Sequence, residues 1–228
     1  GDVYKRQQYL TSNRIGFSKP DSAWRYMGKL NLAWTDNRAD AIEDGRFVEL
    51  NLGAAYRPLE EDRWNTLAKY TYLFDVGSNG QLGPGGRGMG ADLEEKSHVI
   101  SAETLREVTR ELELGGKVTA KLGEQRLRSS GSWYDSRLLF TAVRARYRLP
   151  IRDSQTLECA WEVLAEYRLL KDFEADGVRH GALAGLYWST RNSQFKVGVG
   201  YNFTDFDSDL RGTGHQSGGW FVDLIAAY

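Results

Sequence analysis

QFKVGVGYNFTDFD at positions 194–207 and GGWFVDLIAAY at positions 218–228 are two segments in which apolar and polar residues alternate. In the first, Val197, Val199 and Tyr201 point one way, while the intervening lysine and glycine residues point the other. Successive side chains of a β-strand lie on opposite faces of the sheet. A period of two therefore predicts that both segments are strands with one apolar face.

In the second segment Trp220, Val222 and Leu224 share a face with the terminal Tyr228. An apolar face with aromatic residues near its ends is typical of a strand in a transmembrane β-barrel. The same alternation recurs upstream and predicts ten full strands, preceded by the end of another at Tyr9–Phe17. The full strands are predicted at 24–34, 48–56, 64–74, 96–108, 112–122, 139–147, 157–169 and 178–190, together with the two quoted segments.

Three of these segments are ambiguous. Ala102–Glu113 and Glu158–Leu170 have a composition that also suits helices, although the period of two is better in the second and context favours a strand in the first. In 178–190 bulky residues fall on both faces, because Leu183 and Leu186 have opposite parity. We expect strands in all three, without a face for the last.

Long and short connections alternate between the predicted strands. The long, polar ones are Thr35–Gly45, Gly77–Glu95, Arg126–Asp135, Lys171–Gly177 and Ser208–Ser217, and the short ones are Lys19–Ser22, Pro58–Asp62, Thr109–Glu111, Pro150–Ser154 and Arg191–Ser193. Outer-membrane barrels have long extracellular loops at one rim and short periplasmic turns at the other. The long connections are therefore predicted to lie outside the cell.

The predicted fold is all-β, an antiparallel up-and-down transmembrane β-barrel. Strands of roughly ten to fourteen residues suit the ~9–11 residues that cross a bilayer. Ten full strands and a partial one make an odd number, whereas bacterial single-chain barrels have an even number, so we expect a 12-stranded barrel when complete. The alternative is a soluble sandwich or lipocalin-like barrel, which alternation alone would permit.

The run from Gly198 to Phe206, followed by a polar loop and the run from Gly219 to Ile225, resembles the C-terminal barrel domain of large Gram-negative outer-membrane proteins, autotransporter-like or porin-like. The resemblance implies a location in the bacterial outer membrane, contact with its lipids and no cofactor. It also implies insertion by the barrel-assembly machinery through the C-terminal strand, and a passenger domain upstream. Ala226 departs from the usual terminal signal, because a second aromatic residue is expected there.

The beginning of the chain does not have the features of a natural N-terminus. It lacks an initiating methionine and the charged and apolar segments of a signal peptide. Asp2–Gln7 resembles a translated adapter sequence of the kind found at the ends of metagenomic fragments. We expect residues 1–7 to be a non-native scar, and residues 8–228 to form the barrel domain with its N-terminal strand or strands missing.

Composition narrows the class of protein. Lys+Arg 30 against Asp+Glu 31 gives a net charge of -1, which offers no sign of nucleic-acid binding. No apolar run reaches the 18 or more residues of a membrane-spanning helix. A charged content of 27% suits a soluble protein, but also a barrel in which only alternate residues face lipid. The single Cys159 excludes an internal disulfide.

The strand faces define two sets of candidate residues. The predicted lumen-facing charges, in which both signs are mixed, are Lys29, Glu49, Lys69, Glu103, Glu113, Lys117, Lys121, Arg144, Arg146, Arg148, Glu158, Glu162, Glu166 and Arg168. The predicted membrane-facing aromatic residues are Trp24, Trp34, Trp64, Tyr70, Tyr72, Trp161, Tyr201, Phe203, Trp220 and Tyr228. A tight turn after residue 149 would set Arg146 opposite Glu158, with Arg144 diagonal to Glu158 and Glu162. Such opposite charges stabilise a sheet by roughly 0.2–1 kcal/mol per pair, and we expect this ladder to narrow the lumen.

His98, His180 and His215, the three histidines, all fall near the long-loop rim. We interpret them as solvated loop residues, because no spacing joins a nucleophile, a base and an orienting group. Asp205-x-Asp207-x-Asp209 is a weak match to a calcium loop, since it lacks the glycine at the sixth position and the glutamate at the twelfth. No catalytic, metal or cofactor-binding residue is predicted.

The functional expectation is an integral outer-membrane barrel that anchors a larger cell-surface protein. The first alternative is a narrow porin-like channel for small solutes, and the second is an enzyme at the rim. An upstream passenger domain would favour the anchor, and single-channel conductance would favour the channel.

Overall fold

The structure is a computed structural model that describes residues 6–37, 45–60, 63–76, 93–127, 131–149, 159–190, 195–206, 210 and 218–226. Within these residues the chain forms eleven strands. Their bounds are β1 (Arg6–Ser18), β2 (Trp24–Asn37), β3 (Gly45–Tyr56), β4 (Trp64–Val76), β5 (Leu93–Glu107), β6 (Leu112–Leu127), β7 (Tyr134–Leu149), β8 (Cys159–Asp172), β9 (Gly177–Thr190), β10 (Phe195–Asn202) and β11 (Gly219–Ala226).

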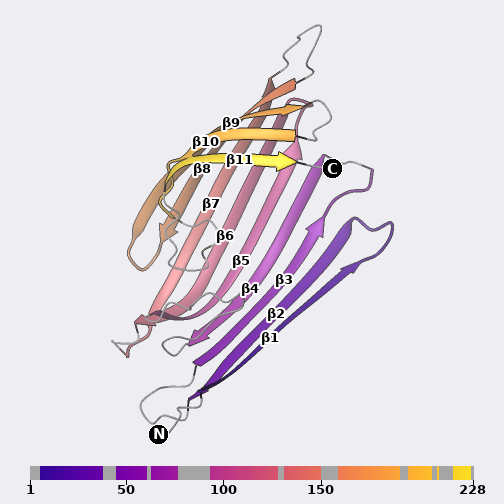
Figure 1. Cartoon of the computed structure of the whole chain (residues 1–228). Helices are drawn as coiled ribbons and strands as arrows, with labels where there is room; N and C mark the ends of the chain where they lie inside the picture. Colours follow the sequence, from indigo (N-terminus) through magenta and orange to yellow (C-terminus); the bar gives the residue numbers. More distant parts are fainter. Residues whose placement is uncertain are drawn as a thin grey trace. The chain divides into compact units, whose positions relative to one another are not determined.

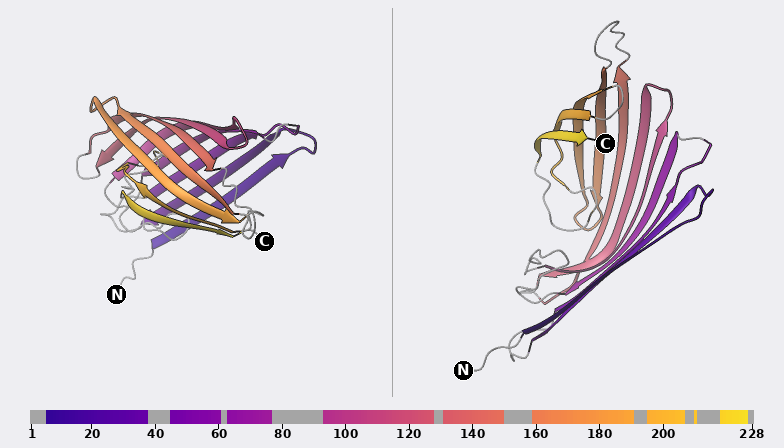
Figure 2. Two further views of the ribbon diagram at one scale, coloured as in Figure 1. Left: turned by 90° about the horizontal axis from the view of Figure 1, so that it is seen from above. Right: turned by 45° about the vertical axis from the view of Figure 1, so that its right-hand side comes forward.

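All eleven strands belong to one sheet whose order is the order of the chain, from β1 in indigo to β11 in yellow (Figures 1 and 2). Neighbours pair antiparallel, as β1 does with β2 and β8 with β9. The predicted all-β, up-and-down antiparallel meander is confirmed, and the segments with helix-like composition form parts of β5, β6 and β8. Closure of the sheet into a barrel and a total of twelve strands stay predictions.

The chain divides into two compact units, which are described separately. Unit 1 consists of Gly1–Tyr56, Leu67–Ser101 and Ala120–Leu138, and contains β1 to β3 with one end of each of β4 to β7. Unit 2 consists of Arg57–Thr66, Ala102–Thr119 and Leu139–Tyr228, and contains the other ends of those strands with β8 to β11.

The pairing register gathers apolar side chains on one face of the sheet. In unit 2, Val199 of β10 lies opposite Leu186 of β9 and Val222 of β11, and all three are exposed. We call this side the apolar face and the opposite side the polar face. The register also settles the face of β9, because Leu186 is on the apolar face while the neighbouring Tyr187 is buried on the polar face.

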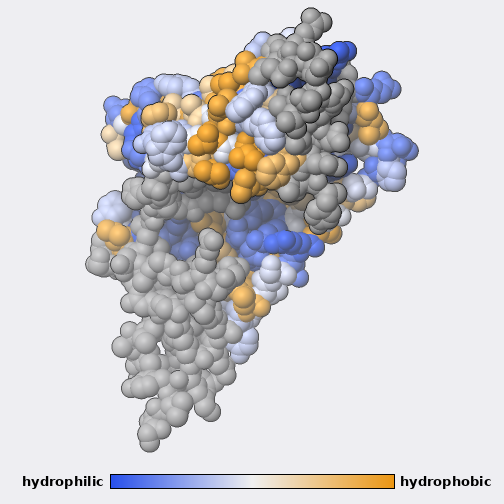
Figure 3. All heavy atoms as spheres, turned by 45° about the horizontal axis from the view of Figure 1, so that its top comes forward, coloured by the Kyte–Doolittle hydropathy of each residue, from blue (hydrophilic) through white to orange (hydrophobic). Residues whose placement is uncertain are grey.

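Burial in this sheet is the reverse of that in a soluble domain. Among the described residues, exposed large hydrophobic side chains outnumber buried ones, and more polar than apolar residues are buried. The largest fully buried side chains are Phe140, Glu94, Asn31, Thr119, Thr204 and Ser97. Apolar side chains, in orange, gather on the surface in the upper part of Figure 3, beside hydrophilic ones in blue. A soluble antiparallel sheet instead packs its apolar face inside.

The expected alternation of long and short connections is wrong at one of the described connections. β8 and β9 are joined by a tight turn, Phe173–Asp176, where a long loop is predicted. The Asp172 carboxylate accepts hydrogen bonds from the backbone N–H groups of Glu174 and Ala175, at 3.0 and 3.1 Å, and Asp176 has φ 47, so aspartates build the turn. The predicted short turn Pro150–Ser154 lies outside the described residues.

Asp176 also forms an ion pair in this turn. Lys171 Nζ donates a hydrogen bond of 2.6 Å to Asp176 Oδ1, and this bond lowers the pKa of the Asp176 carboxyl group. The Asp176 side chain is 91% exposed, so solvent screening leaves the pair little effect on stability.

Substitution of Gly198 tests the packing of the polar face. Gly198 lies opposite Tyr187 and Asp223, and Tyr187 Oη donates a 3.0 Å hydrogen bond to Asp223 across it. A Cβ at Gly198 would lie 2.2 Å from the Tyr187 ring, whereas a Cβ at Gly116 of β6 would meet nothing within 4 Å. We expect Gly198→Val to destabilise the protein by about 1–3 kcal/mol through overpacking. Gly116→Val is the control, and equal thermal midpoints by circular dichroism would contradict this position of the ring.

Candidate functional site on the polar face

Glu162 of β8 is the centre of an ion-pair network in unit 2. Its side chain is 6% exposed and lies 3.2 Å from Arg148 Nη2 and 4.0 Å from Arg146 Nε, both on β7. Lys196 of β10 donates a hydrogen bond to Glu162 Oε2. To do so it passes over the ring of Tyr187 on the intervening strand, 4.9 Å from the centroid. Three cations from two strands therefore compensate one buried carboxylate.

The network continues from β7 toward β5 and β6. Arg144 Nη2 lies 3.5 Å from Glu103 Oε1, and Arg146 Nη1 lies 3.4 Å from Glu113 Oε1. The expected ladder is thus wrong for Arg144, which pairs with Glu103 and not with Glu162. The prediction considered only partners on β8, whereas Arg144 reaches across the sheet to β5. Glu158 lies outside the described residues.

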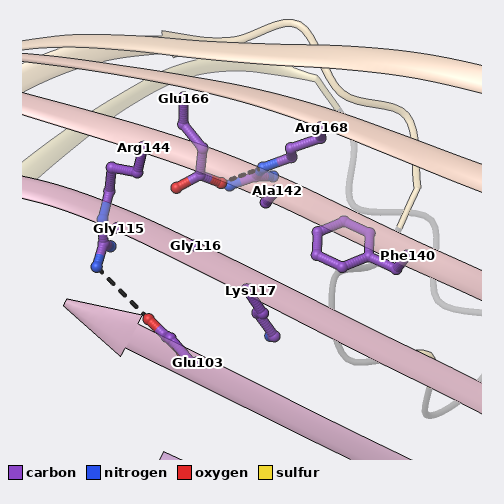
Figure 4. A pocket seen from close by; sticks show the side chains of 9 residues that line it. All are labelled: Glu103, Gly115, Gly116, Lys117, Phe140, Ala142, Arg144, Glu166 and Arg168. Atoms are coloured by element: carbon purple, nitrogen blue, oxygen red, sulfur yellow. Dashed lines mark hydrogen bonds and ion pairs between the residues drawn. The ribbon is translucent and has the colours of Figure 1, made fainter. Parts of the chain in front are cut away.

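A hollow of about 180 Å³ lies beside this network in unit 2 (Figure 4). Arg144 reaches toward Glu103 at one side, and Arg168 donates a 2.5 Å hydrogen bond to Glu166 at another. Gly115 has no side chain to fill this space. A Cβ at this position would lie 2.7 Å from a methyl carbon of Leu105, which is too close. The lining residues are Glu103, Gly115, Gly116, Lys117, Phe140, Ala142, Arg144, Glu166 and Arg168.

An aromatic contact adjoins the hollow. The Phe140 side chain is fully buried, and Lys117 Nζ lies 5.7 Å from its ring centroid. Phe206, which follows β10, meets Phe140 edge to face with centroids 6.2 Å apart and is itself 3% exposed. The segment leading to Phe206 is held by hydrogen bonds to Ala182 O, from Phe203 N at 2.8 Å and Thr204 Oγ1 at 3.4 Å. Chain beyond β10 therefore packs against the polar face.

In unit 1, neutral hydrogen-bond donors contact a carboxylate of the polar face. Glu49 accepts hydrogen bonds from Asn31 Nδ2 at 2.6 Å and Asn51 Nδ2 at 2.8 Å. Ser12 donates to Asn31 Oδ1 at 2.7 Å, and Thr71 donates to Asn51 Oδ1 at 2.8 Å. The expected charge Lys29 lies at the edge of this network, 3.9 Å from Glu49. The expected Lys69 is half-buried on β4.

The closest fully shielded pair in unit 1 joins Lys121 to Glu95 at 2.8 Å, with side chains 6% and 8% exposed. Ser97 also donates a 2.5 Å hydrogen bond to Glu95. The sequence predicts Lys121 as a lumen charge but leaves Glu95 in a loop. Lys196 and Asp223 are likewise absent from the predicted set, although both alternate correctly with apolar neighbours. The alternation of Lys196 and Asp223 with apolar neighbours would have assigned both to the polar face.

The predicted aromatic residues lie on the apolar face, and their ring contacts cluster near strand ends. In unit 1, Tyr9 stacks on Trp34 at 5.2 Å, and Trp24 contacts Tyr56 at 4.9 Å at the opposite ends of the strands. In unit 2, Tyr201 contacts Trp220 at 5.2 Å. Trp24, Trp34, Trp64, Phe203 and Trp220 are exposed, Tyr70, Tyr72, Trp161 and Tyr201 are half-buried, and Tyr228 lies outside the described residues. Whether they face a membrane stays a prediction.

The histidines do not occupy loops as expected. His98 lies in β5 and His180 in β9, and each ring Nδ1 is hydrogen-bonded to a tyrosine hydroxyl, Tyr70 at 2.7 Å and Tyr167 at 2.5 Å. Both rings are nevertheless exposed, and His180 lies inside the strand predicted at 178–190. His215 lies outside the described residues, as do Asp207 and Asp209 of the weak calcium match.

Comparisons with known proteins add no assignment. No family model matches the chain, and neither a curated protein nor a solved structure matches it. Among the described residues, no three histidine, cysteine or acidic side chains are grouped so as to hold a metal ion. In that part of the chain no helix has the length and apolar character needed to cross a membrane.

Replacement of Glu162 tests the network. Glu162→Gln would remove the shared acceptor of three cations, of which Arg148 is 57% exposed and Lys196 20% exposed, so we expect a loss of about 1.5–3 kcal/mol. Glu103→Gln is the matched control, because its single partner lies at 3.5 Å and its side chain is 36% exposed. That change should cost about 1 kcal/mol or less. Thermal unfolding of both variants makes the comparison, and equal losses would contradict a hub at Glu162.

Proposed function

We propose that this chain is an integral β-barrel of the bacterial outer membrane, which anchors a larger cell-surface protein. One observation carries the proposal: the apolar face of an eleven-stranded meander is exposed, while charged side chains are buried on the other face. An exposed apolar surface of this extent would cause association in water. In a barrel within a bilayer, the same surface faces lipid and the polar face lines the interior.

Strand length and aromatic placement agree with this proposal. β1 to β9 have between 12 and 16 residues, which exceeds the ~9–11 needed to cross a bilayer. β10 and β11 are shorter, with 8 residues each. Ring contacts near the strand ends suit the aromatic girdles found at both membrane interfaces. A soluble sandwich would give no reason for aromatic clusters at these positions.

β11 supports a role for the C-terminal strand in assembly. Trp220, Val222 and Leu224 alternate on its apolar face and are 78%, 68% and 70% exposed. β11 is also the last strand in the sheet order. A strand edge in hydrocarbon costs several kcal/mol for each unpaired backbone group. This strand is therefore the one we propose is engaged by the barrel-assembly machinery.

The polar face favours an anchor over an open channel. The hydrogen-bonded segment leading to Phe206 covers part of the polar face in unit 2, and the ion pairs around Glu162 occupy more of it. A narrow channel is the second candidate, because the hollow between Arg144 and Arg168 is lined by charges of both signs. A rim enzyme has no comparable support among the described residues.

Substitution of an apolar-face residue by arginine tests whether this face contacts lipid or water. Val143 lies in the middle of β7 and is 64% exposed. An arginine at the bilayer midplane of a barrel costs about 2–4 kcal/mol, whereas surface substitutions in water change stability by about 0.5 kcal/mol or less. We expect Val143→Arg to reduce the heat-modifiable protein in outer-membrane fractions severalfold.

Leu59→Arg is the control for this experiment. Leu59 is 65% exposed but lies in the connection between β3 and β4. Its substitution should leave insertion unchanged. If Val143→Arg and Leu59→Arg behave alike, or the unmodified protein does not fractionate with the outer membrane, the proposed location is wrong.

Planar-bilayer recording distinguishes the anchor from the channel. We expect little conductance from the unmodified barrel, and a larger conductance from Phe206→Ala, which removes the ring packed on Phe140. Phe203→Ala is the control, because Phe203 is 62% exposed on the apolar face. A large, stable conductance of the unmodified protein would instead favour the channel.

A further inference from the structure

Trp133 of unit 1 lies between two cations. Lys96 Nζ is 4.0 Å from the centroid of the Trp133 ring, and Arg126 Cζ is 4.8 Å from it. Lys96 is also 5.8 Å from the ring centroid of Phe74. Attraction to aromatic rings holds each cation, and it brings two positive charges to the same indole.

One acidic side chain offsets part of this charge. Arg126 Nε donates a hydrogen bond to Glu94, whose side chain is 2% exposed. Within the described residues no carboxylate forms an ion pair with Lys96. Lys96, Arg126 and Glu94 together therefore leave one net positive charge, which is centred on Lys96 and Trp133.

Lys96 and Arg126 have the parity of the apolar face, at one end of their strands, and Trp133 directly precedes β7. Lys96 has the parity of Ile100, which is 57% exposed, and Arg126 has the parity of Leu122, which is 55% exposed. Both lie near the end where β5 begins and β6 ends. In a barrel this is the depth of the lipid headgroups, where lysine and arginine side chains can reach anionic lipid groups.

We propose that Lys96, Arg126 and Trp133 bind a phosphate group of a phosphorylated glycolipid in the outer leaflet. The inference rests on the proposed outer-membrane location, and on the prediction that the connection between β4 and β5 is extracellular. Arg126 presents its remaining guanidinium donors and Lys96 its ammonium, a combination that matches phosphate oxygens. The acyl chains would lie along the apolar face below.

Native mass spectrometry of the intact barrel in detergent tests the site. The probes are bisphosphorylated lipid A, its dephosphorylated form, phosphatidylglycerol and inorganic phosphate. Lys96→Gln and Trp133→Leu are the informative variants, because both leave the bond between Arg126 and Glu94 in place. The matched control is Lys19→Gln, since Lys19 is exposed in the connection between β1 and β2.

We expect the unmodified barrel and Lys19→Gln to retain bisphosphorylated lipid A equally. Loss of one charged partner should weaken retention by Lys96→Gln roughly tenfold, and Trp133→Leu should weaken it while keeping both charges. Equal retention by all variants would overturn the site but not the outer-membrane location. Retention of dephosphorylated lipid A or phosphatidylglycerol, or displacement by inorganic phosphate, would overturn the proposed ligand. A chain that does not insert would overturn the proposed function, and this site with it.

Discussion

Pairing of each strand with the next along the chain is the constraint on which the other features depend. Once Val199 lies opposite Leu186 and Val222, the parity of every residue in β9, β10 and β11 is set. A slip of one residue would exchange the two faces of a strand. Val222 would then point to the charged face and Lys196 to the apolar one. The two faces therefore specify the register as strongly as a buried core does in a soluble sheet.

Buried carboxylates of the polar face have two kinds of partner. In unit 2, Glu162 is surrounded by Arg146, Arg148 and Lys196, so charge compensates charge. In unit 1, Glu95 pairs with Lys121, and Glu49 accepts hydrogen bonds from the amides of Asn31 and Asn51. Buried carboxylates are tolerated only when their oxygens have partners. Both arrangements supply these partners from neighbouring strands, and so they join the strands on a face without an apolar core.

The two faces also divide the functional roles that we propose. The apolar face supplies lipid contact over its whole extent, and its few cations matter because they occur among apolar residues. Lys96 therefore indicates a specific binding role, whereas a lysine on the polar face would be expected among its other charged residues. The polar face carries the hollow beside Arg144 and the packed Phe206. We propose that these features decide whether solutes pass.

The amino-acid sequence by itself determined the strands, their up-and-down order and most of the faces, because a period of two is a local property of the chain. Charges within clean alternation, such as Glu162 and Arg168, could be assigned to the polar face in the same way. The ion-pair partners could not, since they depend on strand register and on how far each side chain reaches across the sheet: Arg144 pairs with Glu103 of β5 and not with Glu162 of β8. Only the tertiary structure placed Lys196 over Tyr187 and Phe206 against Phe140, since these contacts join positions that no local pattern relates.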